Sequence, residues 1–383
     1  MLITYQLLKL FPIFTVMKNN KRNLILSILL IVQILLVKLA SNYPSFIERY
    51  YANGIYPYIS SFFRFLLGWI PFSVGDILIG VGVFYLLRFL YQLIRTKFKN
   101  FISKILQLVA VFSGLYFCFY FFWGLNYFRE PLAKNLGYSQ SKYTTAQLTN
   151  VTEKIISNLN TYQLLITKND TLKVKNPYTQ KEMYAMAIVG YHNLEKEFPQ
   201  LTYRYPSVKS SMMSLFQSYN GTAGYLNPIT GEAQVNDRIP KTSYPTTTCH
   251  EMAHQIGFAA ENEANFIGFL AANYNNDVYF KYASYRMAFG YCIREVRKRD
   301  RNASKELWKT VNIGIIKDFK KKNYRKESKG LSDESCCELN TERASSCSQS
   351  SDEDVSVPRG AVSSFWPWGR SPLGAPHPHC CRY

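Results

Sequence analysis

The residues best suited to do chemistry lie together at His250-Glu251-Met252-Ala253-His254, which has the pattern His-Glu-x-x-His. Residues four positions apart project from the same side of a helix. Both imidazoles can therefore bind one Zn²⁺, which takes nitrogen ligands at about 2.0–2.1 Å. Zinc lowers the pKa of a bound water toward about 7, and Glu251 can accept its proton. The pattern predicts a catalytic zinc site with His250 and His254 as ligands and Glu251 as general base.

A catalytic zinc site also needs a third protein ligand and keeps a fourth position open. Two glutamates, Glu261 and Glu263, follow shortly after Gly257, where a glycine can turn the chain back toward the histidines. Both would lie in the first turn of the next helix, and the sequence hardly separates them. We prefer Glu263 as the third ligand and keep Glu261 as the alternative.

A zinc peptidase needs two further parts besides its metal ligands. An edge strand aligns an extended peptide, and the segment 224–236 lies where such a strand would come, just before the motif helix. The alternative for this segment is an ordinary hairpin. A tyrosine that stabilises the oxyanion can be sought at Tyr274, Tyr282 or Tyr285, and the sequence favours none of the three.

The first third of the chain is far more apolar than the rest. Apolar runs lie at about 24–40, 74–94 and 105–122, and each is close to the length of about 20 residues that a helix needs to cross a bilayer. The stretch between the first two runs is rich in Tyr, Phe and Trp, which suits the headgroup interface. We expect a membrane region over residues 1–125, with the true start at Met1 or Met17.

Basic residues indicate how this region is oriented. Lys and Arg are frequent before the first run and in the 95–104 loop, whereas the 41–73 loop has only Arg49 and Arg64. Loops rich in Lys and Arg stay in the cytoplasm. We therefore expect a multi-pass protein of the cytoplasmic (inner) membrane, with the lipid bilayer as a partner and an extracytoplasmic C-terminal domain.

The composition becomes that of a soluble domain after residue 125. Its patterns predict helices at about 144–160, 181–198 and, with breaks, 247–324, a short helix after Pro206, and a hairpin at 221–237 with its turn at 228–231. We expect an α+β domain over residues 126–326 that is mostly helical with a small sheet. Residues 327–383 are rich in Ser, acidic residues and Cys, which predicts a disordered or foreign tail.

The formal charge of +19 raises the question of nucleic-acid binding. However, the basic residues are not accompanied by a zinc-finger, RNA-recognition or helix-turn-helix signature. Many of them flank the apolar runs, where positive-inside topology favours them. We therefore expect no nucleic-acid partner.

Several motifs together resemble domain of unknown function 3810, a family of bacterial membrane proteins. The matching segments are 123–127 (Trp-Gly-Leu-Asn-Tyr), 129–132, 224–228, 230–236, 248–255, 263–266 and 269–271. The resemblance implies N-terminal transmembrane helices followed by a zincin-like domain of the gluzincin type, and it brings no established substrate. The run Glu263-Ala264-Asn265 also resembles the third-ligand segment of gluzincin-like toxin–antitoxin and stress-response peptidases, which supports Glu263.

These observations lead to one preferred function and one alternative. The preferred function is a membrane-anchored, zinc-dependent metallopeptidase that hydrolyses a peptide or protein substrate. The alternative is a non-catalytic envelope protein with a structural metal site or a partner-binding surface. The sequence leaves the substrate and the oligomeric state open.

Overall fold

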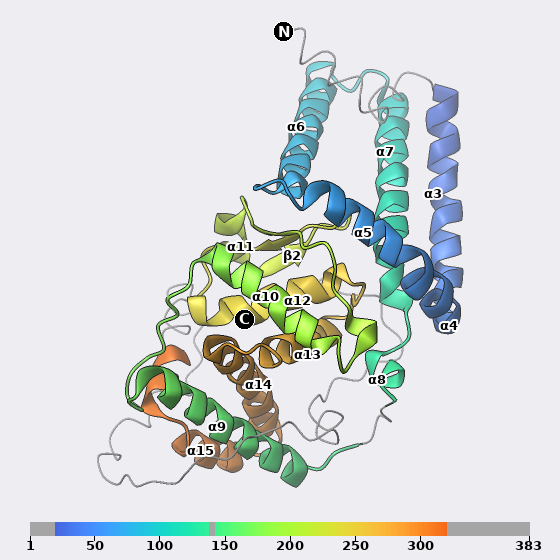
Figure 1. Cartoon of the computed structure of the whole chain (residues 1–383). Helices are drawn as coiled ribbons and strands as arrows, with labels where there is room; N and C mark the ends of the chain where they lie inside the picture. The colour runs from blue at the N-terminus through green and yellow to red at the C-terminus, as the bar shows by residue number, and fades with distance from the viewer. Residues whose placement is uncertain (1–19, 138–141, 320–383) are drawn as a thin grey trace.

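The computed structural model describes residues 20–137 and 142–319 of the 383-residue chain. These residues are mostly helical and include a three-stranded sheet. Figure 1 shows three long helices, α3, α6 and α7, standing on one end of a larger helical body. The predicted tail at 327–383 and both candidate start residues lie outside the described part of the chain.

The three long helices confirm the three predicted apolar spans. They are α3 (Asn20–Ala40), α6 (Val74–Arg95) and α7 (Phe101–Phe122). Each is long and apolar enough to cross a membrane, and few of its apolar residues are buried against protein. The chain is therefore a membrane protein. Its basic 96–100 turn and the start of α3 lie at the end far from the body (Figure 1).

A helical segment joins the first two spans and crosses the top of the body (Figure 1). It consists of α4 (Pro44–Phe46), η2 (Ile47–Ile55) and α5 (Tyr56–Leu67). The nine residues of η2 form a π-helix, a rare conformation that is frequently found at functional sites. After α7, η3 (Gly124–Phe128) and α8 (Leu132–Asn135) return the chain to the body.

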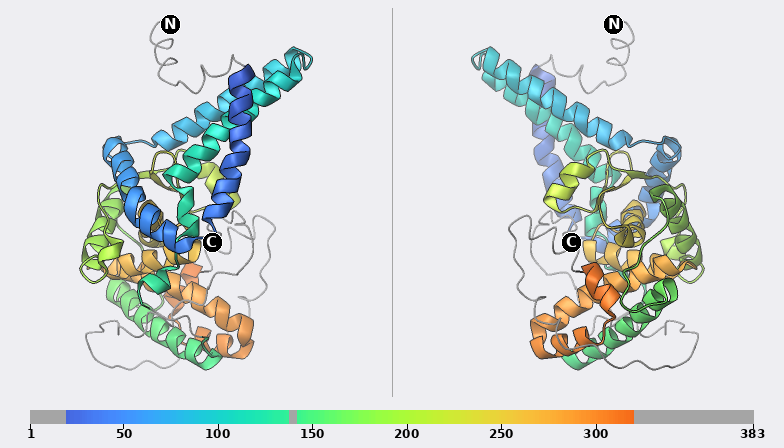
Figure 2. Two further views of the ribbon diagram at one scale, coloured as in Figure 1. Left: turned by 90° about the vertical axis from the view of Figure 1, so that its right-hand side faces the viewer. Right: turned by 90° about the vertical axis from the view of Figure 1, so that its left-hand side faces the viewer.

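The body is built from helices packed around one apolar core. Its main helices are α9 (Thr145–Thr167), α10 (Gln180–Leu194), α12 (Tyr244–Gln255), α13 (Glu261–Asn273), α14 (Val278–Arg299) and α15 (Arg301–Lys309). Two of them begin with a capping box, Thr144 with Gln147 and Thr179 with Glu182. The two views of Figure 2 place α9, α14 and α15 at the end of the body opposite the spans.

The sheet lies between the membrane helices and the rest of the body. Its strands are β1 (Val208–Ser210), β2 (Gly224–Leu226) and β3 (Ala233–Val235), in the order β1-β3-β2. β2 and β3 form the predicted hairpin and pair antiparallel, whereas β1 pairs parallel to β3. No described strand pairs with the outer edge of β2.

One local prediction in this region was incomplete. The short helix expected after Pro206 is present as α11 (Ser214–Asn220), but strand β1, which was not predicted, precedes it. The cause is a long-range contact: the Lys209 ammonium forms a buried ion pair with Glu232, and Val208 pairs with Ala233. Neither partner is visible in the local pattern.

The sheet is bonded directly to the first turn of membrane helix α6. The Glu232 carboxylate accepts hydrogen bonds from the backbone N–H groups of Val74 (3.1 Å) and Gly75 (2.5 Å). The Tyr225 hydroxyl donates to the Asp76 carboxylate. These contacts cross the predicted boundary at residue 125, which itself stays a prediction. A fragment that begins there would lose them.

Candidate metal centre

Helix α12 carries the His-Glu-x-x-His motif and is buried along its whole length. Pro245 stands in its first turn, where a missing N–H costs nothing. Cys249 is fully buried, as expected of a small packing residue, and its carbonyl accepts a hydrogen bond from Tyr191. The helix therefore projects His250 and His254 from a rigid support.

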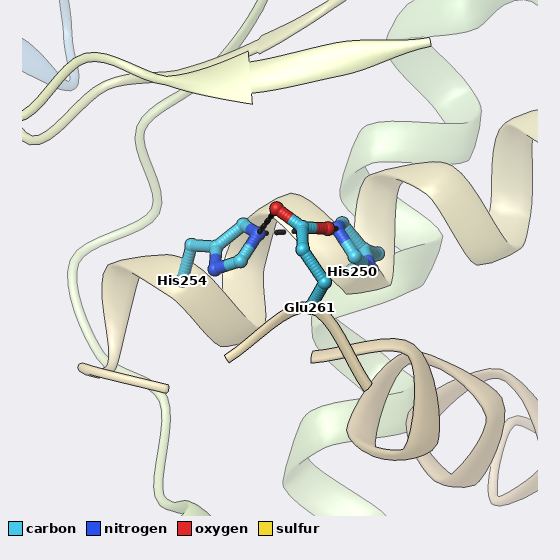
Figure 3. A group of neighbouring side chains, drawn as sticks. All are labelled: His250, His254 and Glu261. Atoms are coloured by element: carbon cyan, nitrogen blue, oxygen red, sulfur yellow. Dashed lines mark hydrogen bonds and ion pairs between the residues drawn. The ribbon is translucent and has the colours of Figure 1, made fainter. Parts of the chain in front are cut away.

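The two imidazoles and one carboxylate converge at the start of α13 (Figure 3). The Nε2 atoms of His250 and His254 are 3.1 Å apart. Glu261 Oε2 lies 3.3 Å from His250 Nε2, and Glu261 Oε1 lies 3.6 Å from His254 Nε2. One ligand atom from each of these residues lies within 4.8 Å of the others.

This donor set fits Zn²⁺. Ligand atoms placed tetrahedrally at 2.0–2.1 Å from zinc lie about 3.3 Å from one another, and the separations given above, which involve both Glu261 carboxylate oxygens, scatter around that value. Two imidazole nitrogens and a carboxylate oxygen are also the ligand types of catalytic zinc. The Glu261 side chain is 46% exposed, so the site opens to solvent on its side.

The His254 ring is held in the orientation that metal binding requires. Its Nδ1 lies 2.7 Å from the Phe258 carbonyl oxygen, a contact that places the ring proton on Nδ1 and the lone pair on Nε2. Burial lowers the pKa of His254 to about 4, although Glu261 opposes this shift. The imidazole is therefore neutral at pH 7, as a metal ligand must be.

Glu251 is buried between α12 and the edge strand. Its side chain is 1% exposed and touches Gly224, where a Cβ would lie 2.6 Å from Glu251 Oε1. Its Oε2 has no hydrogen-bond partner among the described residues. Burial raises the pKa of Glu251 to about 8, while His250 lowers it and Glu261 raises it further. A nearby cation would favour the carboxylate form.

The structure places the two candidate third ligands differently. Glu261, the alternative, lies beside both histidines, whereas Glu263, the preferred candidate, does not belong to this group. Glu263 is buried, and its Oε1 accepts a hydrogen bond from the Leu132 backbone N–H at 2.8 Å. It therefore binds the first turn of α8. Both residues lie in the first turn of α13, as predicted, but they point to different partners.

Three side chains from the membrane-proximal segments bind the C-terminal end of α12. The Trp123 indole N–H donates to the His254 carbonyl at 3.0 Å. The hydroxyls of Tyr56 (2.9 Å) and Ser60 (2.6 Å) donate to the Gln255 carbonyl. These bonds satisfy carbonyls that have no partner within the helix. This role was not predicted from the sequence. Ser60, a polar residue within the mostly apolar segment 56–67, was a signal that this segment contacts protein.

A buried ion pair supports the turn after α12. Arg129 forms a two-pronged contact with Glu48 of the π-helix, at 2.7 and 3.0 Å, and also donates to the Gly257 carbonyl at 3.0 Å. Its guanidinium lies 4.1 Å from the Phe258 ring centre. Because the Phe258 carbonyl contacts His254, Arg129 connects the π-helix to a candidate metal ligand through one intervening residue.

The three candidate oxyanion tyrosines have other partners. The hydroxyls of Tyr274 and Tyr282 donate to Glu197 and Asp318. Tyr285 stacks on the ring of Tyr162. Their role at the site stays an untested prediction.

The comparisons with known proteins identify the family without assigning an activity. A model of the family described as "Protein of unknown function (DUF3810)" matches residues 51–336. No curated protein and no solved structure matches the chain. The matched segment covers most of the chain and contains the α5–α13 region described above. The chain therefore belongs to the DUF3810 family of proteins of unknown function.

Proposed function

We propose that this protein is a membrane-anchored zinc metallopeptidase whose metal ligands are His250, His254 and Glu261. The observation that carries the proposal is the convergence of the two imidazole Nε2 atoms, which are 3.1 Å apart, with the Glu261 carboxylate, whose two oxygens lie 3.3 and 3.6 Å from them. Glu261 takes the place that the sequence favoured for Glu263, because Glu263 is bound to α8. Zinc held there would supply a Lewis acid and lower the pKa of a water.

Glu251 is the proposed general base. It lies on the metal-ligand helix beside His250 and is buried against Gly224 of β2, with one carboxylate oxygen that has no partner among the described residues. A carboxylate so placed can take a proton from the attacking water and pass it to the leaving amine. A purely structural site has no use for such a group, which supports catalysis over the non-catalytic alternative.

Strand β2 supplies the proposed substrate contact. It is the edge strand of the sheet and lies against Glu251 through Gly224. An extended peptide can add to such an edge by main-chain hydrogen bonds. The scissile bond would then lie between the strand and the metal ligands. This arrangement is the basis for proposing a zincin-like, gluzincin-type domain.

The location is proposed from the distribution of charge. Lys21 and Arg22 belong to the first turn of α3, and Figure 1 shows the start of α3 and the 96–100 turn, which contains two lysines, at the end far from the body. Loops rich in Lys and Arg stay in the cytoplasm. We therefore place the body on the extracytoplasmic side of the inner membrane.

Hydrolysis of casein by the full-length chain in detergent tests the proposal. We expect zinc-dependent hydrolysis that falls about 100-fold or more in Glu251→Gln, with zinc content unchanged because Glu251 is not a ligand. Glu153→Gln, the same chemical change at an exposed position of α9, serves as the control. Hydrolysis that persists in Glu251→Gln would contradict the proposed mechanism.

A further inference from the structure

Two short helices of the body have their polar side chains inside and their apolar side chains outside. They are α5, from the segment between the first two spans, and α11, which lies about 150 residues later in the chain. Figure 1 shows both at the end of the body from which the long helices emerge. A helix on a protein surface in water normally has the opposite arrangement.

In α5 the reversal is clear from a comparison of adjacent residues. Arg64 is 4% exposed and its guanidinium donates to the Arg204 carbonyl at 2.5 Å, whereas neighbouring Phe65 is 69% exposed. The exposed large apolar side chains of this segment, through to the start of α6, are Tyr58, Phe62, Phe65, Leu66, Trp69 and Phe72. Most of them are aromatic, which is typical of the headgroup interface.

Helix α11 repeats this pattern. Ser214 is 3% exposed and accepts a hydrogen bond from the Asp237 backbone N–H, whereas Phe216 is 77% exposed. Leu215, Tyr219 and the preceding Met212 are exposed as well. The helix has the sequence SLFQSYN and contains no charged residue. Leaving a side chain such as phenylalanine in water costs about 1.5–3 kcal/mol relative to burying it. The four exposed side chains, Met212, Leu215, Phe216 and Tyr219, therefore favour a nonaqueous environment.

The two apolar surfaces are continuous with the spans. The Asp76 carboxylate, in the first turn of α6, accepts hydrogen bonds from the Met212 backbone N–H (2.6 Å) and the Ser211 hydroxyl (3.1 Å). On the other side, Phe65 contacts Tyr205 with ring centres 5.7 Å apart. The start of α6 therefore holds the residues just before α11, and α5 ends at Leu67, seven positions before α6 begins at Val74.

We propose that α5 and α11 rest on the bilayer that α3, α6 and α7 cross, with their apolar side chains in the lipid interface. Lipid is the occupant because it already surrounds the span to which both surfaces are joined. The body then lies against the membrane through this surface as well as through the spans.

This placement also locates the candidate site. Strand β2 begins four residues after α11 ends, its Tyr225 bonds Asp76 of the span, and its Gly224 touches Glu251. The free edge of β2 is therefore held at the membrane surface. If this conclusion is combined with the proposed peptidase function, on which it rests, the substrate class becomes polypeptides that are held at the same membrane and cut close to it.

Quenching of tryptophan fluorescence by brominated lipid tests the lipid contact without any reference to catalysis. The full-length chain carrying Phe216→Trp or Tyr219→Trp is reconstituted in phosphatidylcholine vesicles with or without bromine on the acyl chains. We expect the fluorescence added by each new tryptophan to fall by about half or more with brominated lipid. The control is Leu172→Trp, which is 53% exposed and lies beside Gly314, away from the spans. Equal quenching at positions 216 and 172 would overturn the proposal.

The substrate class is tested in the same vesicles with casein that is either free or coupled to lipid. Trypsin measures how much coupling alone changes the rate. We expect this protein to prefer coupled casein by about tenfold or more beyond the trypsin ratio, since the free edge of β2 is held at the membrane surface. A ratio equal to that of trypsin would overturn the substrate class. Hydrolysis of neither form would contradict the peptidase function, while the quenching result would still decide the lipid contact.

Discussion

Helix α11 precedes β2 in the chain and helix α12 follows β3, and the two helices depart from the usual surface-helix pattern in opposite ways. All twelve residues of α12 are buried, including His250, Glu251 and His254. In α11 the apolar side chains are exposed and Ser214 is buried. Buried charged residues are uncommon unless they are paired or functional, and clustered exposed apolar residues mark an interaction surface. Each departure therefore points to a different function, the first to chemistry and the second to lipid.

The comparison predicts that removing a buried side chain that supports α12, such as Arg129, lowers the stability of the protein strongly. Arg129→Met leaves Glu48 buried without its cation, so we expect the free energy of unfolding in detergent to fall by about 3–5 kcal/mol. The matched control is Lys134→Met, which breaks the exposed pair with Glu130 and should cost less than about 1 kcal/mol. Adding Glu48→Gln to Arg129→Met should restore part of the lost free energy of unfolding, because the buried charge is removed. Equal effects of the two single changes would contradict the buried support.

Glu251 should make the metal-free protein sensitive to pH. Its folded-state pKa, about 8, is above the ordinary value of 4.5. The protonated carboxyl is therefore favoured by folding, and stability is lost as pH rises from about 4.5 through about 8. With a chelator present, Glu251→Gln should be more stable than wild type at pH 9 by roughly 2–4 kcal/mol and nearly equal at pH 4. A stability difference that does not change with pH would argue against a buried, protonated Glu251.

Close packing between α12 and α13 can be tested at Gly268. A Cβ there would lie 3.0 Å from the His250 backbone nitrogen and 3.1 Å from its Cα. We expect Gly268→Ala to lower the free energy of unfolding by about 1–3 kcal/mol and to weaken zinc binding, because the two helices must separate. Gly290→Ala in α14, where the nearest atom would be 3.6 Å away, should instead be neutral or stabilising by up to about 1 kcal/mol.

The smallest expected effects lie in α11 and sharpen the contrast with α12. Ser214→Ala removes the acceptor of the Asp237 N–H and should cost about 1 kcal/mol in detergent. Phe216→Ser, at a far more exposed position, should change the free energy of unfolding by less than about 0.5 kcal/mol. Unfolding measured by chemical denaturation of the two variants checks this order. A larger loss for Phe216→Ser would mean that this side chain packs against protein.

Local patterns in the sequence were sufficient for much of this structure. The apolar runs predicted the spans, the Pro228–Gly231 turn predicted the hairpin, and the helix expected from about residue 144 is present as α9. The spacing of His250 and His254 likewise brought two ring nitrogens together. In each case the determining feature is local in the sequence.

Long-range contacts account for what the sequence left open. Glu261 and Glu263 stand two positions apart on one helix turn, and only the approach of α8 to Glu263 separates their roles. The strand at Val208–Ser210 depends on β3 and on the Lys209–Glu232 ion pair. The contacts of Tyr56 and Trp123 with α12 join residues more than 100 positions apart. Such pairings depend on the packing of whole elements.

The affinity of the full-length chain for zinc in Glu261→Gln and Glu263→Gln tests the central claim most directly. Chelator competition would measure the dissociation constant of each variant and of wild type. We expect Glu261→Gln to weaken zinc binding by about 100-fold or more, because a ligand is lost. Glu263→Gln should change it by less than about threefold, since its amide oxygen can still accept from Leu132. The reverse order would make Glu263 the ligand, and no zinc binding by folded wild type would contradict the metal centre itself.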